Sequence, residues 1–109
     1  MEENFIALEK YLPSEKYLPI GSVVTIANHP KTIIIVGYGA YEQENNEEQP
    51  TIYDYCGYPY PEGYTGEENI VIFNHNVVTE IKHKGYMSDN YSQINEEIKN
   101  MIENSQKEI

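Results

Sequence analysis

Apolar and β-branched residues gather in five short segments in the middle of the chain, and this pattern predicts β-strands. The segments cover residues 22–28, 32–36, 51–56, 70–73 and 77–83. Their length and their content of Val, Ile, Thr and Tyr are typical of strands. Short polar turns separate the first pair and the last pair, while Gly37 and Gly39 end the second strand. We therefore expect the first two strands to form a hairpin and all five to belong to an antiparallel fold.

Five short antiparallel strands favour one of two related β-dominated α+β folds. One is a small SH3-like barrel and the other is a strongly bent open sheet, because closure or bending protects exposed strand edges. Within the third strand, Asp54 shares a face with Ile52 and Cys56, opposite Tyr53 and Tyr55. A charged residue usually faces water, so we expect the tyrosine face to be the more buried one.

Helical periodicity appears only at the two ends of the chain. Phe5, Leu8 and Leu12 predict a short N-terminal helix within an extension over residues 1–17. The β domain covers residues 18–86, and residues 87–109 form a longer C-terminal helix of about five turns, capped by Ser88 or Asp89. Its apolar stripe consists of Tyr91, Ile94, Ile98, Met101 and Ile102. This stripe either packs on the sheet or docks another helix.

The charge balance restricts the classes of partner. Among 109 residues, 18 are acidic and 7 are basic, all of them lysine, which gives a net charge of −11. Nucleic acid and anionic membranes are poor partners for such a chain, since their recognition relies on positive charge and on arginine. A basic protein partner fits better, although the acidity could also serve solubility alone.

Cysteine usage and hydropathy bear on where the protein acts. The single cysteine, Cys56, rules out an internal disulfide framework and fits a reducing compartment. No basic-then-apolar leader is visible, and no run reaches the roughly 18 apolar residues of a membrane span. We therefore expect a cytoplasmic protein without membrane insertion.

The densest cluster of unusual residues lies between Ile52 and Gly66, which holds five of the eleven tyrosines. Its prolines exclude a helix, and we expect a strand that runs into an ordered loop. In one interpretation Tyr55, Tyr58, Tyr60 and Tyr64 fold back and cap one end of the domain. In the other they form a recognition surface, and the two interpretations can hold together.

The sequence contains no clear motif for a catalytic or metal-binding site. His29, His75 and His83 lack the paired spacing of metal ligands, so no metal or other cofactor is expected. Cys56 has no local signature of a nucleophile. The glycines of the tyrosine segment stand between strands rather than before a helix, which excludes a phosphate-binding loop. The sequence predicts no catalytic residues and no enzymatic activity.

Four motifs resemble one family of small bacterial proteins. They are LPIGSVV at residues 18–24, IIIVGY at 33–38, YDYCGYPYPEG at 53–63 and FNHNVVTEIKHKGY at 73–86. Together they are similar to the family described as domain of unknown function 4176. The resemblance implies a setting beside type VII secretion components and LXG toxins, with accessory, targeting or chaperone roles, and it brings no catalytic residues.

Taken with the resemblance, the residues predict a non-enzymatic chaperone or targeting factor. It would bind a type VII-secreted LXG toxin or the toxin's small helical partners. The expected partner-binding residues are Tyr58, Tyr60, Glu62, Tyr64, Glu67 and Glu68. The alternative is an immunity protein that neutralises a toxin domain. The oligomeric state stays open.

Overall fold

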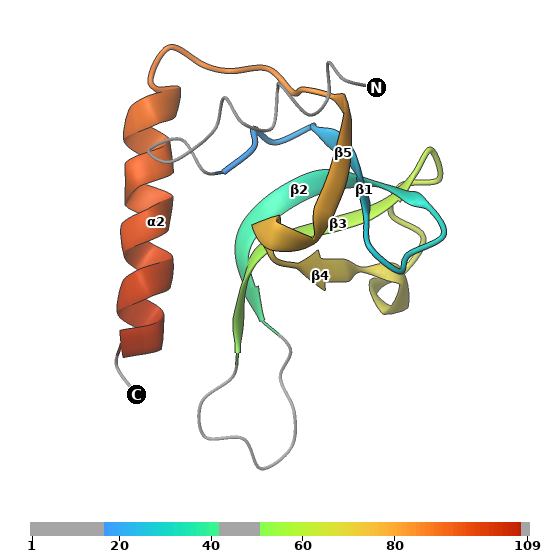
Figure 1. Cartoon of the computed structure of the whole chain (residues 1–109), viewed down its shortest axis with the longest axis horizontal. Helices are drawn as coiled ribbons and strands as arrows, with labels where there is room; N and C mark the ends of the chain where they lie inside the picture. Colours follow the sequence, from blue (N-terminus) through green and yellow to red (C-terminus); the bar gives the residue numbers. More distant parts are fainter. Residues whose placement is uncertain (1–16, 42–50, 108–109) are drawn as a thin grey trace.

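Five β-strands form one antiparallel sheet that curves around a buried apolar core (Figure 1). The structure, a computed structural model, describes residues 17–41 and 51–107. The predicted helix over residues 1–12 and the polar tip over residues 42–49 lie outside the described residues. The elements are β1 (Val23–Ile26), β2 (Thr32–Tyr41), β3 (Ile52–Tyr60), η1 (Glu67–Asn69), β4 (Val71–Phe73), η2 (His75–Val77), β5 (Val78–His83) and α2 (Tyr91–Lys107).

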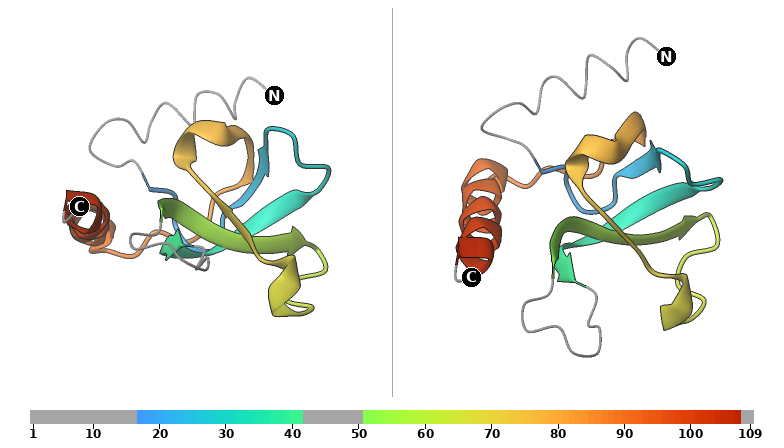
Figure 2. Two further views of the ribbon diagram at one scale, coloured as in Figure 1. Left: turned by 90° about the horizontal axis from the view of Figure 1, so that it is seen from below. Right: turned by 60° about the horizontal axis from the view of Figure 1, so that its bottom comes forward.

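The sheet is bent but not closed. Its strand order is β4-β3-β2-β1-β5, so β4 and β5 form its two edges, although only η2 separates them in sequence. No ladder joins these two strands in the described part of the chain. Of the two predicted alternatives, the bent antiparallel sheet is therefore the one observed, and the closed barrel is not (Figure 2).

The two central strands are longer than predicted. β2 continues past Gly37 and Gly39 to Tyr41, because Val36 forms a bulge that leaves the pairing intact on either side. A side chain at Gly37 would lie 2.9 Å from the Cys56 sulfur, so glycine permits this close pairing. β3 continues through Pro59, which lies beyond the end of β4. Proline is tolerated there because no neighbouring strand on the β4 side needs a hydrogen bond from a backbone N–H at this position.

The inner face of the sheet supplies the core. The fully buried residues Val24, Ile33, Ile35 and Tyr55 share it with Phe73. Tyr55 also makes ring contacts with Tyr17, Tyr38, Phe73 and His75, at centroid distances between 5.3 and 6.0 Å. The prediction that Tyr55 is buried is confirmed.

The expectation that Asp54 marks the exposed face is wrong. Asp54 is buried, and its Oδ2 accepts a hydrogen bond of 2.8 Å from the His75 backbone N–H. Its Oδ1 accepts a second bond, of 3.4 Å, from the Tyr17 hydroxyl. A buried carboxylate is tolerated when hydrogen bonds replace its water. These bonds fix the start of η2 and the segment that precedes β1.

Helix α2 packs on the sheet through a stripe that differs in part from the predicted one. Tyr91, Asn95 and Ile102 are buried, whereas Ile94 and Met101 are 37% and 49% exposed. The first helical hydrogen bond runs from the Ile94 N–H to the Asn90 carbonyl. Asn90 therefore occupies the N-cap position, in place of the predicted Ser88 or Asp89.

Asn95 attaches the helix to the segment that precedes β1. Its Oδ1 accepts the Tyr17 N–H at 3.2 Å, and its Nδ2 donates to the Tyr17 carbonyl at 2.8 Å. This side chain is 1% exposed, so both bonds are shielded from water. Sequence periodicity missed it, because a polar residue does not count toward an apolar stripe.

Replacing Asn95 tests this attachment. Asn95→Ala leaves two buried backbone groups without their partner, and we expect the free energy of unfolding to fall by about 2–4 kcal/mol. Asn100→Ala removes the same side chain from an exposed position of α2 and should change stability by less than about 0.5 kcal/mol. Urea unfolding followed by circular dichroism measures both, and equal effects would contradict the assigned role.

Candidate functional site

The outer face of the sheet is apolar and tyrosine-rich. Alternation along β3 places Cys56, Tyr58 and Tyr60 on the side opposite buried Tyr55 and Gly57. The register puts Ile34 beside Tyr58 and Ile72 beside Cys56. We use the name outer sheet face for the set Ile34, Val36, Cys56, Tyr58, Tyr60, Tyr64 and Ile72. A solvent-facing side of an antiparallel sheet is normally polar, so this composition needs an explanation.

A loop tyrosine extends the outer sheet face. Tyr64 packs edge-on against Tyr58, with ring centroids 5.3 Å apart and an interplanar angle of 86°. The loop folds back over β3 through a 2.7 Å hydrogen bond from the Gly63 N–H to the Pro59 carbonyl. Gly63 adopts a φ of 75°, which glycine allows at low cost. The loop after β3 is therefore ordered, as predicted.

The tyrosines of the segment divide by exposure. Tyr55 is fully buried, Tyr58 is half-buried, and Tyr60 and Tyr64 are 47% and 65% exposed. The packing interpretation therefore holds for Tyr55, while Tyr60 and Tyr64 remain available for a recognition surface. Partial burial, and then the neighbouring Tyr64, Cys56 and Glu67, raise the pKa of the Tyr58 phenol. Tyr58 therefore stays a neutral hydrogen-bonding group at neutral pH.

A second feature, which we name the end hollow, lies at one end of the sheet, where strand alternation puts Pro59 and Val71 on the same side as Tyr55 and Phe73. It has a volume of about 490 Å³ and lies between the turn joining β1 to β2 and the segment joining β3 to β4. Pro59 and Val71 contribute apolar surface, while Glu62 and Glu68 contribute carboxylates.

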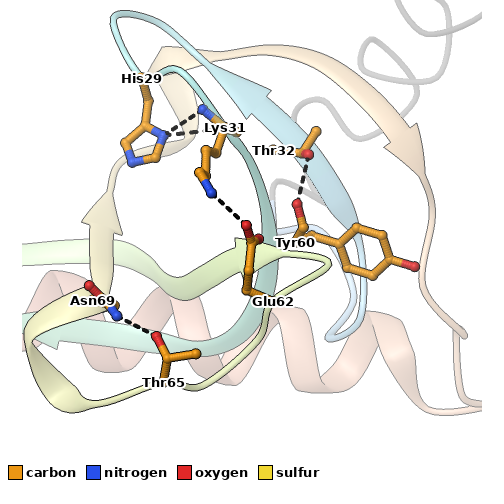
Figure 3. A network of polar contacts seen from close by, with 7 residues as sticks. All are labelled: His29, Lys31, Thr32, Tyr60, Glu62, Thr65 and Asn69. Atoms are coloured by element: carbon orange, nitrogen blue, oxygen red, sulfur yellow. Dashed lines mark hydrogen bonds and ion pairs between the residues drawn. The ribbon is translucent and has the colours of Figure 1, made fainter.

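Polar contacts join the two segments that border the end hollow (Figure 3). Lys31 Nζ lies 2.5 Å from Glu62 Oε2, and the His29 ring accepts the Lys31 backbone N–H at 3.2 Å. The hydrogen bond from Lys31 holds the pKa of Glu62 below its usual value. The ring of Tyr60 points away from this ion pair (Figure 3).

The structure divides the predicted binding residues between these two surfaces. Tyr58, Tyr60 and Tyr64 belong to the outer sheet face, and Glu67 lies close enough to influence Tyr58. Glu62 and Glu68 instead line the end hollow. Sequence reasoning missed Ile34, Val36 and Ile72, because an uninterrupted apolar run gives no sign of which residues alternate outward.

The structure shows the surroundings of the residues considered for catalysis. The His75 ring is hydrogen-bonded to the Tyr55 hydroxyl, and burial raises the pKa of the Cys56 thiol. Within residues 17–41 and 51–107, no three side chains of His, Cys, Asp or Glu are grouped so as to hold a metal ion. No helix in the same ranges has the length and hydropathy to cross a membrane.

Comparison with known proteins gives one match. The sequence model of the family described as domain of unknown function (DUF4176) matches residues 17–94, which include all five strands and the start of α2. No curated protein and no solved structure matches the chain.

The raised pKa of Cys56 has a measurable consequence. At about pH 8 a smaller thiolate fraction should make iodoacetamide alkylation of the folded chain roughly threefold slower or more, compared with the chain unfolded in urea. Mass spectrometry of the alkylated protein gives both rates. Faster labelling of the folded chain would indicate an activated nucleophile and would contradict this assignment.

The ion pair at the end hollow makes a prediction about acid titration. A lowered pKa means that the Lys31–Glu62 pair stabilises the fold above the ordinary glutamate pKa, and that this contribution is lost as pH falls through the lowered value. Lys31→Met should therefore raise the pKa of Glu62 toward about 4.3, as measured by carboxyl carbon NMR. Lys82→Met removes a lysine from β5 and should leave the pKa of Glu62 unchanged.

Proposed function

The chain belongs to the family described as domain of unknown function 4176, and we propose that it acts as a non-enzymatic binding protein. In this proposal it is a cytoplasmic chaperone or targeting factor. Its partner is an LXG toxin exported by a type VII secretion system, or one of the small helical proteins that accompany such a toxin. The outer sheet face is the binding surface.

The observation that carries the proposal is the apolar character of the outer sheet face. Contiguous apolar surface rimmed by polar residues marks interaction sites in soluble proteins. Tyrosine suits such a surface, since it offers a large contact area with few rotatable bonds. Tyr60 and Tyr64 leave much of their surface exposed, while Ile34 and Tyr58 are partly covered.

Shape and charge together favour a helical partner. The face presents half-buried aliphatic residues between exposed tyrosines, on which the apolar stripe of an amphipathic helix can pack. The chain carries a net charge of −11, and Glu67 lies near Tyr58. Such a field accelerates encounter with a basic partner and disfavours acidic ones. We therefore propose an amphipathic helix with basic flanks as the bound element.

Tyrosine replacements test the binding surface. Tyr60→Ala and Tyr64→Ala should each weaken binding to the toxin's N-terminal helical region by about tenfold, in the range of interface hot spots. Tyr86→Ala is the matched control, since Tyr86 is 84% exposed and lies outside the outer sheet face. Isothermal titration calorimetry against that region, alone and with its small helical partners, gives the affinities.

Two results would contradict the proposal. One is an equal loss of affinity in Tyr86→Ala, which would remove the link to the outer sheet face. The other is binding to the toxic C-terminal domain alone, with protection of cells that co-express that domain and this chain. That second result would instead support the immunity function.

A further inference from the structure

The end hollow is a separate surface with its own chemistry. Its apolar lining comes from Pro30, Pro59, Ile70 and Val71, and its polar lining includes Glu62 and Glu68. Its volume of about 490 Å³ falls in the range of sites that bind small groups, roughly 300–1,000 Å³. The outer sheet face lies on the opposite side of β3, so the binding surface proposed above does not account for this hollow.

The charges around the end hollow are not balanced. Glu62 is paired with Lys31, whereas no lysine in the described ranges pairs with Glu68. Glu68 lies on η1, and its carboxylate folds over Gly66, where a side chain would come within 2.7 Å of Oε1. Glycine at position 66 thus leaves room for the carboxylate. The lining of the hollow thus includes two carboxylates, Glu62 and Glu68, but one lysine, which is paired with Glu62.

A hollow lined by both apolar residues and carboxylates matches one kind of side chain. Lysine and arginine pack their methylene groups on apolar surface while the cation reaches a polar partner. Pro59 and Val71 would contact the methylenes, and the cation would meet Glu68 and the Lys31–Glu62 pair. A neutral apolar side chain would leave Glu68 partly desolvated, which is costly without a partner.

We propose that the end hollow receives a lysine or arginine side chain of the protein partner. This inference rests on the proposed function, because it names a basic residue on the partner that also contacts the outer sheet face. Lys31 competes with the incoming cation for Glu62. Glu68 is the carboxylate of the hollow that pairs with no lysine among residues 17–41 and 51–107.

Because Lys31 and the added cation compete for Glu62, we expect Glu68→Gln and Lys31→Met to change the affinity for an arginine compound in opposite directions. Titration of the nitrogen-15-labelled full chain with N-acetyl-arginine-N-methylamide, followed by NMR, should shift the amides of Glu68, Asn69 and Val71 in a saturable way. Glu68→Gln should weaken this binding about threefold, and Lys31→Met should strengthen it about threefold, as expected for partly exposed ion pairs. The uncharged N-acetyl-citrulline-N-methylamide is the matched ligand control.

Several results would overturn the inference. These are no saturable shifts with the arginine compound, equal binding of the citrulline compound, or weaker binding in Lys31→Met. Tyr64→Ala should leave the arginine titration unchanged, because Tyr64 lies on the outer sheet face. If the arginine compound does not bind but the toxin region still binds in a Tyr64-dependent way, the proposal for the end hollow is refuted and the proposed function is not. Arginine binding without any toxin binding refutes the proposed function but leaves the hollow as a cation site.

Discussion

The fold depends on the buried side chain of Tyr55, which joins parts of the chain that are distant in sequence. Its hydroxyl accepts the Leu18 N–H at 2.9 Å and lies 2.6 Å from His75 Nδ1, to which it can donate its proton. Its ring packs against Tyr17, Tyr38 and Phe73. One side chain thus links the segment before β1, the central strands and η2. Burial raises the pKa of this phenol above its usual range, so the hydroxyl keeps its proton at neutral pH.

The position of Tyr55 decides what the outer sheet face contains. Because β3 alternates, a ring committed to the core at position 55 forces Cys56, Tyr58 and Tyr60 to the other side. The segment cannot shift by one residue without moving Tyr55 into water. The exposed tyrosines are therefore held on a strand whose register is fixed from within. Such a surface loses little conformational entropy on binding, which favours affinity.

Much of the fold was predictable because its signals are local. β-branched runs identified all five strands, and the residues between Asn90 and Lys107 gave a clear helix. The errors share one physical origin, which is that tertiary partners override local rules. Asp54 is buried because the His75 N–H and the Tyr17 hydroxyl are its partners. Asn95 is buried since it pairs with the Tyr17 backbone. No sequence window contains both partners of these contacts.

Contacts between residues distant in sequence also explain why the candidate site is divided into two surfaces. Sequence order places Glu62 beside Tyr60, but Glu62 pairs with Lys31 of the turn between β1 and β2 and lines the end hollow. The register of β2 against β3 brings the Thr32 hydroxyl within 3.3 Å of the Tyr60 carbonyl, so Tyr60 stays on the strand. Neither contact is visible in the order of residues along the loop.

The chain has no arginine, and this limits how many of its carboxylates can be paired within the protein. Eighteen carboxylates face seven lysines, and a lysine ammonium cannot hold two carboxylates in the fixed fork of a guanidinium. Most acidic side chains must therefore rely on water or on a partner for their counter-charge. At Glu68 the apolar lining of the end hollow lies beside the carboxylate, so a partner's lysine or arginine gains the packing of its methylene groups as well as the charge interaction. That gain depends on the shape of the hollow, and general acidity alone would not supply it.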